Sequence, residues 1–423
     1  MKRYWRSPTL RTAGVYGAAG AGFAVANLVL ARVLPPAEYA VVTLVVALVN
    51  VGYALAPLGL DAVVNRRRLE AGPALLRHTL LATSLTGAAF AAVGAAFYET
   101  TPLLTAVIFL STAAGGALMV AAAQFQSEQR FGISLTLVQG PNLVLLLAAL
   151  VTAAAGVREA WLPLLIMTAG WFPFALWGWR ALFRERHAKP GGATDLPWAE
   201  ALSFAGVQVT GLLMIQLERL VLPHVLPLAD LATFGVLAAI AGSLFRVLQM
   251  GVGYTLVPRL RAASDVRQRR RLVAKEARMV AAVALLGSAA IWLVTPVVED
   301  WFLGGKYHLG GPLLLAALIS GVAKVVNSFT RAVAAALGTA AELAAVSVLG
   351  WVAVGVALAA AVVGARWGLA GVIYGVTLGW TLRSVSTFYF AARHLRLPGT
   401  RRTGQPAGVA GVPADEGDGI HAH

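Results

Sequence analysis

Apolar runs, each long enough to be a transmembrane helix, fill nearly the whole sequence and are separated by short polar breaks. A helix of roughly 20 residues crosses the ~30 Å hydrocarbon core of a bilayer. Because lipid offers no partner to a free backbone amide, each of these runs has to be helical. With 58% hydrophobic and only 13% charged residues, the chain also has too little polar surface to cover a soluble globule of 423 residues. The sequence therefore predicts an all-α polytopic membrane protein.

The positions of these runs predict twelve transmembrane spans. They cover residues 12–33, 38–60, 78–97, 102–123, 134–156, 160–182, 200–223, 230–257, 279–298, 313–337, 342–363 and 368–392. The apolar part of the first run is longer than a signal-peptide core, and no A-x-A-like cleavage site closes it. We therefore expect the first run to be a retained helix.

Basic residues gather in the connections on one side of the predicted membrane. Of the 34 lysines and arginines, 26 fall on the side that holds both termini and four on the other side. The positive-inside rule then places both termini in the cytoplasm and the chain in the cytoplasmic (inner) membrane. This topology and anionic lipid headgroups explain the net charge of +15, so no nucleic-acid partner is expected. The absence of cysteine excludes disulfides and thiolate metal sites.

A short motif occurs twice, 192 residues apart, each time in a break between two apolar runs: VLPPAEYA at 33–40 and VLPLADLA at 225–232. Such a repeat indicates a duplication. With six spans in each half, both halves start on the same side, which predicts two parallel lobes related by a pseudo-two-fold axis. The expected division is a cytoplasmic N-terminal arm (1–11), an N-lobe (12–183), a cytoplasmic linker (184–199), a C-lobe (200–394) and a disordered cytoplasmic tail (395–423).

Few ionisable side chains lie deep inside the predicted spans, and those that do are in the second half. Each costs about 2.5–3.5 kcal/mol at a helix centre, so each one is a candidate for a functional role. Helical spacing places polar neighbours on the same faces as the cations, as with Lys324 and Asn327. The candidate substrate-binding residues are Gln208, Glu218, Arg219, Arg246, Gln249, Lys324, Asn327 and Arg383. They predict a water-filled cavity of positive potential, which suits an anionic, phosphate-bearing substrate.

A structural interpretation of these residues stays open beside the functional one. Arg219 could extend toward the outer membrane interface, and Glu218 could neutralise a neighbouring cation. The first six spans differ, because at comparable depth they carry only neutral polar residues. These are Asn27, Asn50, Gln139 and Asn142.

The sequence lacks the motifs of the common enzyme classes. Its seven histidines fall in or near predicted loops or the tail without metal-site spacing, and it contains no phosphate-binding P-loop. Glu299 and Asp300 lie in a predicted outer loop, where a solvated interfacial role is the default for a carboxylate pair. We therefore expect a transporter rather than an enzyme, with no catalytic residue, metal or cofactor.

Four stretches of the sequence resemble a known family. They are LARVLPPAEYAVVTLVVAL at 30–48, LERLVLPHVLPLADLATFGVLAAI at 217–240, VPRLRAA at 257–263 and RWGLAGVIYGVTLGW at 366–380. With twelve spans in two halves, the chain resembles the polysaccharide flippases of the multidrug/oligosaccharidyl-lipid/polysaccharide exporter (MOP) superfamily. The resemblance covers the membrane region up to about residue 395.

The resemblance implies a V-shaped pair of lobes that alternates between inward-open and outward-open states. The substrate would be an undecaprenyl-pyrophosphate-linked oligosaccharide, a polysaccharide or O-antigen-type repeat unit that crosses to the outer leaflet. Glu218 and Arg219 correspond to the family's acid–arginine pair, and Arg219, Arg246, Lys324 and Arg383 to cations that contact the pyrophosphate. The implied partners are the lipid-linked glycan, membrane lipids, a glycan polymerase and glycosyltransferases.

Other functions remain as alternatives. An exporter of another amphiphile or of a drug would share the superfamily, but the predicted cations disfavour a cationic cargo, and the first half has no membrane-embedded acid for ion coupling. Lipid II flippases are expected to resemble the chain less, because they normally have fourteen spans and arginines in the first helix. A membrane-embedded glycan polymerase or ligase would need a large outer loop, and the longest expected here covers only residues 298–312.

Overall fold

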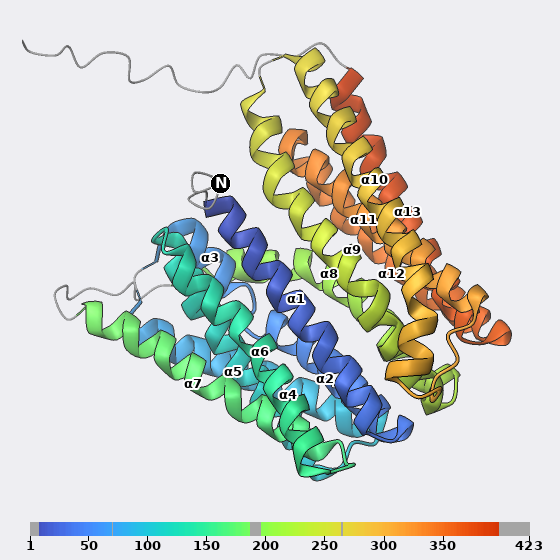
Figure 1. Ribbon diagram of the computed structural model, residues 1–423. Helices are drawn as coiled ribbons and strands as arrows, with labels where there is room; N and C mark the ends of the chain where they lie inside the picture. Colours follow the sequence, from blue (N-terminus) through green and yellow to red (C-terminus); the bar gives the residue numbers. More distant parts are fainter. Residues whose placement is uncertain (1–7, 70, 187–195, 264, 397–423) are drawn as a thin grey trace, which may run out of the picture.

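Helices account for nearly all of the structure. The computed structural model describes residues 8–69, 71–186, 196–263 and 265–396 (Figure 1), and these ranges contain no strand. The first lobe's helices are α1 (Pro8–Val33), α2 (Pro36–Leu55), α3 (Leu60–Arg67), α4 (Pro73–Tyr98), α5 (Pro102–Ser127), α6 (Phe131–Ala155) and α7 (Trp161–Arg186). The second lobe's helices are α8 (Trp198–Val225), α9 (Leu228–Ala262), α10 (Val266–Val297), α11 (Gly311–Leu337), α12 (Ala340–Gly364) and α13 (Gly368–Arg396). A π-helical turn, η2 (Val298–Phe302), follows α10, and a 3-10 turn, η3 (Ala365–Trp367), joins α12 to α13.

The predicted all-α polytopic fold is confirmed. All of these α-helices except the eight-residue α3 have between 20 and 35 residues, and the twelve long ones follow the twelve predicted spans in order. By length and composition, ten apolar helical segments of the described chain could cross a membrane. One of them, Ala341–Leu395, contains both α12 and α13, and the described apolar part of α1 is shorter, at Gly17–Val33. The chain is therefore a multi-pass membrane protein.

Several predicted boundaries are wrong, because hydropathy finds only the part of a helix that lies in hydrocarbon. α10 begins at residue 266 rather than 279, so most of the basic segment expected as a loop is helical. Arginine and lysine are good helix formers, and their charges suit the water outside the membrane. α9 likewise continues to residue 262, and the short α3 was not predicted. The expected arm, linker and tail lie largely outside the described residues, since 1–7, 187–195 and 397–423 are not described.

The repeated motif forms the same turn in both halves. Pro35 precedes α2 with φ −56° and ψ 150°, and Pro227 precedes α9 with φ −55° and ψ 148°. A proline ring restricts φ to about −65° and lacks an N–H donor, which is compatible with a helix start and disrupts a helix interior. The motif therefore acts as a turn between two antiparallel helices, at equivalent places in the two halves.

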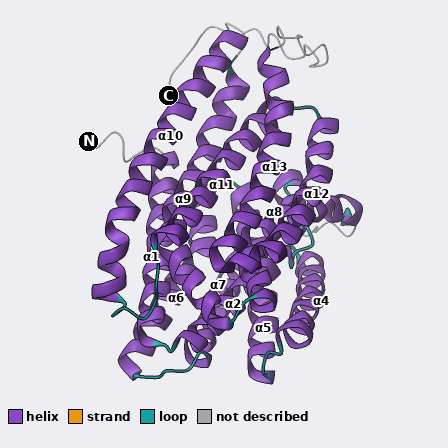
Figure 2. Cartoon of the chain, turned by 90° about the vertical axis from the view of Figure 1, so that its right-hand side faces the viewer, coloured by secondary structure: helices purple, strands orange, loops and turns teal. Residues whose placement is uncertain are grey.

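The long helices form two groups that diverge toward one end of the molecule (Figure 1). α1–α7 make one group and α8–α13 the other, and the start of α1 lies at the diverging end. We call the diverging end the basic end. The opposite end, which carries the turns at 33–36 and 225–228, is the proline-turn end. A view turned by 90° shows the long helices running side by side, without strands, in the described part of the chain (Figure 2). The result is the V shape that was expected.

The two groups meet closely at the proline-turn end. A Cβ atom on Gly235 of α9 would lie 2.6 Å from Thr43 Oγ1 and 3.0 Å from the Tyr39 ring of α2, so only glycine allows this approach. The Tyr307 hydroxyl donates to the Ala31 carbonyl oxygen at 3.2 Å, which connects the loop after η2 to α1. These contacts hold α1 and α2 against α9 at this end.

A second set of contacts lies at the basic end, on the side of α2, α3 and α8. Gly59 has φ +82°, and a Cβ there would overlap the Ala201 carbonyl oxygen of α8. Glu200 of α8 accepts from Arg66 at 3.2 Å and from Arg67 at 2.5 Å. Both arginines are more than half exposed, so these ion pairs contribute little to stability. The position of α8 beside α3 therefore depends mainly on the glycine.

Candidate functional site

Glu218 and Lys324 form an ion pair between α8 and α11. The Lys324 ammonium donates to Glu218 Oε1 at 2.6 Å, and the two side chains are 20% and 1% exposed. Glu218 Oε2 has no partner among the described residues. Lys324 lies at the middle of α11, far from either helix end. Glu218 thus neutralises a cation, which is one of the two roles left open by the sequence, and it pairs with Lys324 rather than with its neighbour Arg219.

Arg219 is buried inside the protein rather than extended toward the surface. Its side chain is 8% exposed, its Nη1 donates to Gln216 Oε1 at 2.8 Å, and its guanidinium lies 5.9 Å from the Phe234 ring centre. Its Nε has no partner among the residues that the structure describes. Arg219 also interacts electrostatically with Arg246 and with Tyr39. One hydrogen bond and one ring leave most of its donors free.

Arg246 lies near the middle of α9, on the side that faces the other lobe. Its guanidinium stands 5.0 Å from the ring centre of Phe23 in α1, and it interacts electrostatically with Tyr53 of α2. The structure therefore brings a C-lobe cation onto an aromatic surface of the N-lobe. The stabilisation that Arg246 gains from an aromatic ring is only a fraction of what a salt bridge with a carboxylate would give inside a membrane.

Arg383 joins a second cationic group nearer the basic end. It donates from Nη1 to the Thr210 carbonyl oxygen at 3.3 Å and from Nη2 to Thr210 Oγ1 at 3.4 Å, and it is 5% exposed. A Cβ on Gly211 would lie 3.7 Å from guanidinium nitrogens of both Arg331 and Arg383. We call Arg331 and Arg383 the Gly211 pair. Gly211 precedes Arg219 by eight residues on α8, which places the two cationic groups about 12 Å apart along the helix.

The neutral candidates have different surroundings. Asn327 of α11 is 4% exposed, and its Nδ2 has no partner in the described part of the chain. Gln208 of α8 and Gln249 of α9 are half-buried. Asn327 is therefore a buried amide with free hydrogen-bonding capacity in the same lobe as the cations.

The charges of this region do not balance. The pair of Glu218 with Lys324 is neutral, whereas Arg219, Arg246 and Arg383 form no salt bridge with any described carboxylate. Leaving a buried cation unpaired is costly in a membrane protein. Arg219 is buried and Arg246 half-buried, and the repulsion between these two cations adds to this cost. Unpaired positive charge is therefore the main electrostatic feature of this region.

Two residues of this region were missed by the sequence analysis as site residues. Arg331 lies near the end of a predicted span, and only the fold brings it to Gly211 beside Arg383. Tyr39 belongs to the repeated motif, and its buried hydroxyl donates to Asn27 Oδ1 at 3.5 Å while its ring lies close to Arg219. Arg331 follows Lys324 by seven residues, so helical spacing already places both on one face of α11, whereas only tertiary proximity identifies Tyr39.

Glu299, which lies in η2 rather than in the predicted loop, has a structural role. Glu299 accepts from the backbone N–H of Leu309 at 3.2 Å and lies 3.7 Å from His308. No group of three or more acidic, histidine or cysteine side chains in the described ranges could hold a metal ion. Glu299 thus closes its own loop.

The fold is shared with known transporters. No protein-family model and no curated protein sequence matches the chain. Among solved structures, the lipid II flippase MurJ in its inward closed conformation gives a TM-score of 0.61 at 7% identity, covering 90% of this chain and 87% of that one. An inward-facing MATE multidrug transporter of the MOP superfamily gives 0.51 at 14%, covering 90% and 94%. A MOP transporter of Pyrococcus furiosus, described as having a binding pocket of reversed polarity, gives 0.53 at 13%, covering 92% and 96%.

These likenesses establish the fold alone. Sequence identities of 7–14% are too low to transfer a function from one protein to another. The expected smaller likeness to lipid II flippases does not hold for the fold, because the TM-score with MurJ is higher than with the other two structures. Lipid II flippases normally have fourteen spans and this chain is expected to have twelve. The chain nevertheless covers 87% of MurJ, because the helices that both proteins have share one arrangement.

Proposed function

We propose that the chain is a flippase that moves an anionic, lipid-linked oligosaccharide across the cytoplasmic membrane by alternating access. The substrate class is an undecaprenyl-pyrophosphate-linked repeat unit of a polysaccharide or O-antigen type. One observation carries this proposal: Arg219, Arg246 and Arg383 are embedded in the membrane protein without a described carboxylate partner. A pyrophosphate would supply the missing negative charge, with acceptor oxygens for several guanidinium donors.

The sign of the charge favours this substrate over a cationic drug. A cationic cargo would add to the repulsion between Arg219 and Arg246, whereas an anion between them would relieve it. Transporters whose names assign them lipid II and drug substrates share the fold, so the fold alone leaves both classes open. The unpaired cations of the second lobe support the proposal of an anionic substrate.

The proposed substrate defines the partners. Glycosyltransferases would build the oligosaccharide on its lipid at the cytoplasmic face, and a glycan polymerase would consume it at the outer face. The lipid portion would stay in the bilayer beside the protein, because moving a long hydrocarbon chain into an aqueous path would lose its burial free energy. No cofactor, metal or catalytic residue takes part in this scheme.

Arg246 is the residue on which transport should depend most directly. We expect Arg246→Ala to reduce flipping of a fluorescent lipid-linked glycan in proteoliposomes by about tenfold or more, since a hydrogen bond to a charged group contributes about 1.5–3 kcal/mol. Arg246→Lys, which keeps the charge but not the planar fork, should retain part of the activity. Protein level and melting temperature in detergent serve as controls. Normal flipping by a well-folded Arg246→Ala protein would refute the anionic substrate site.

The proposed orientation has its own test. Reporter enzymes fused after residue 187 and after residue 401 should both report a cytoplasmic location, because basic connections remain inside. A fusion after Arg158, between α6 and α7, should report the opposite side. An outward signal from either of the first two fusions would contradict the twelve-span topology.

A further inference from the structure

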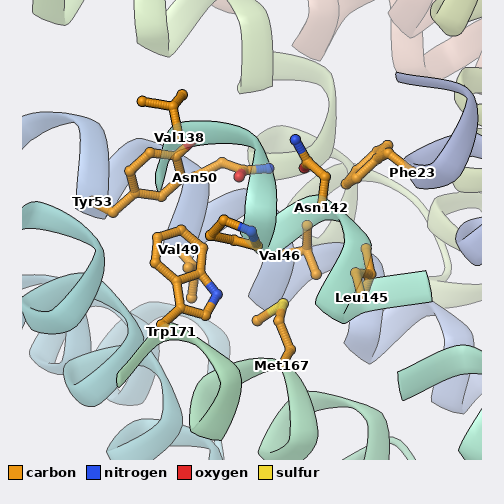
Figure 3. A pocket seen from close by; sticks show the side chains of 11 residues that line it. Phe23, Val46, Val49, Asn50, Tyr53, Val138, Asn142, Leu145, Met167 and Trp171 are labelled. Carbon is orange, nitrogen blue, oxygen red and sulfur yellow. The ribbon is translucent and has the colours of Figure 1, made fainter. Parts of the chain in front are cut away.

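A small pocket of neutral side chains lies in the first lobe, opposite the cations. Residues of α1, α2, α6 and α7 line it, and its volume is about 30 Å³. In Figure 3 the amide groups of Asn50 and Asn142 approach each other at one end of the pocket, while Trp171 and Met167 lie at the other end. A volume of this size holds one group as large as a water molecule or a hydroxyl.

Hydrogen-bonding groups of this pocket are available to a ligand. The Trp171 indole N–H is buried and has no partner among the described residues. The Asn50 amide makes no side-chain hydrogen bond within the described chain, and Asn142 donates one to Gln139 Oε1 at 2.8 Å. An amide both donates and accepts, and an indole only donates. Together they match a hydroxyl group, which also donates and accepts.

Aromatic rings form the side of the pocket. Tyr53 and Trp171 lie with ring centres 4.9 Å apart, and the Phe23 ring lines another side of the pocket. No charged side chain lines the pocket. Apolar walls with a few convergent polar groups are typical of sites that orient an uncharged ligand group.

Phe23 joins this pocket to the cationic region. One face of its ring lies under the Arg246 guanidinium at 5.0 Å, while its side chain also lines the pocket. Tyr53, another lining residue, interacts electrostatically with Arg246. An anion held by Arg246 would therefore lie beside the entrance of a neutral, hydroxyl-matching pocket on the opposite lobe.

We propose that this pocket binds a hydroxyl group of a neutral sugar ring attached directly to the phosphate that Arg246 holds. The inference rests on the proposed function and deepens it, since it assigns the charged part of the substrate to the second lobe and the sugar to the first. One ligand then contacts both lobes at once. Asn50, Asn142 and Trp171 are specificity-determining residues that discriminate a phosphosugar from a bare phosphate.

The test compares two soluble probes on the detergent-solubilised full chain: glucose 1-phosphate and inorganic phosphate. Titration calorimetry should show glucose 1-phosphate binding about tenfold more tightly than phosphate, the ratio expected for one or two hydrogen bonds that only the sugar makes. Asn50→Leu and Asn142→Leu keep similar volume and remove the amide. Each should reduce this ratio to about one to three while leaving phosphate binding within about twofold.

Two further variants separate this inference from the function on which it rests. Asn65→Leu, an exposed change of the same kind on α3, should keep the wild-type ratio. Arg246→Ala should weaken both probes by a similar factor. Phosphate binding without a preference for the sugar, or a preference that survives both pocket variants, overturns the sugar pocket alone. Failure of the wild-type protein to bind either probe overturns both the pocket and the proposed anionic site.

Discussion

Lys324→Ala should destabilise the protein by about 3–5 kcal/mol, because it leaves the Glu218 carboxylate buried without its partner. Glu218 is 1% exposed and already has one oxygen without a described partner, and its neighbour Arg219 interacts with it electrostatically without forming a salt bridge. The measurement is the melting temperature of the purified protein in detergent, together with its level in the membrane. Loss of transport by this variant alone would therefore not separate a substrate contact from a folding defect.

A double-mutant cycle makes that separation. Glu218→Gln combined with Lys324→Met removes both charges, and we expect it to recover most of the lost stability, because a neutral pair costs far less to bury than one unpaired charge. Flipping by the recovered double variant then measures the contribution of Lys324 to transport. A Lys324→Ala protein as stable as the wild type would show that the ion pair contributes nothing to folding.

Gly235→Val should prevent the two lobes from closing at the proline-turn end. Its Cβ would lie 2.6 Å from Thr43 Oγ1, and two further methyl groups would press on the Tyr39 ring. Overpacking of this kind costs about 1–3 kcal/mol, which shifts the population away from the closed arrangement by roughly tenfold or more. Valine is compatible with a helical backbone, so each lobe should still fold. Only the contact between the two lobes should change. We expect transport to fall by a similar factor.

The absence of cysteine from the chain makes this shift directly measurable. Ala31 of α1 is fully buried at the contact with Tyr307, so a single cysteine in place of Ala31 should react slowly with a membrane-impermeant maleimide. The same cysteine in the Gly235→Val background should react about tenfold faster. Gly242→Val on the same helix, where an added Cβ meets nothing within 4 Å, is the matched control. Equal labelling rates in all three proteins would show that Gly235 does not limit closure.

The sequence predicted helix number and order well, and helix ends poorly. Long apolar runs identify a membrane helix because burial in lipid dominates its free energy. The basic start of α10 and the whole of α3 lie outside the hydrocarbon, where hydropathy carries no information about helix formation. The prolines of the repeated motif were informative for a different reason, since a restricted φ acts locally and needs no tertiary contact.

The candidate site was predictable only in part. An ionisable residue inside an apolar run is visible in the sequence, so Arg219, Arg246, Lys324 and Arg383 could be named in advance. The partners of Arg246, Lys324 and Arg383 could not be named, because they lie on other helices more than one hundred residues away. The sequence left open whether Glu218 neutralises a cation and did not say which one, whereas in the structure it pairs with Lys324, 106 residues later. Arg331 needed the approach of α11 to α8 to become part of a cationic pair.

The sequence by itself determined that this protein is a duplicated, twelve-helix membrane protein whose deeply membrane-embedded charges lie in the second half. Those properties follow from local terms, namely hydrophobic burial, proline geometry and the cost of charge in lipid, which depend on residue type and spacing. Only the tertiary structure decided which cations are paired, which have no described carboxylate partner, and that a neutral pocket of the first lobe lies beside Arg246. Those properties depend on distances between helices, and interhelical packing sets such distances through contacts that no single segment encodes.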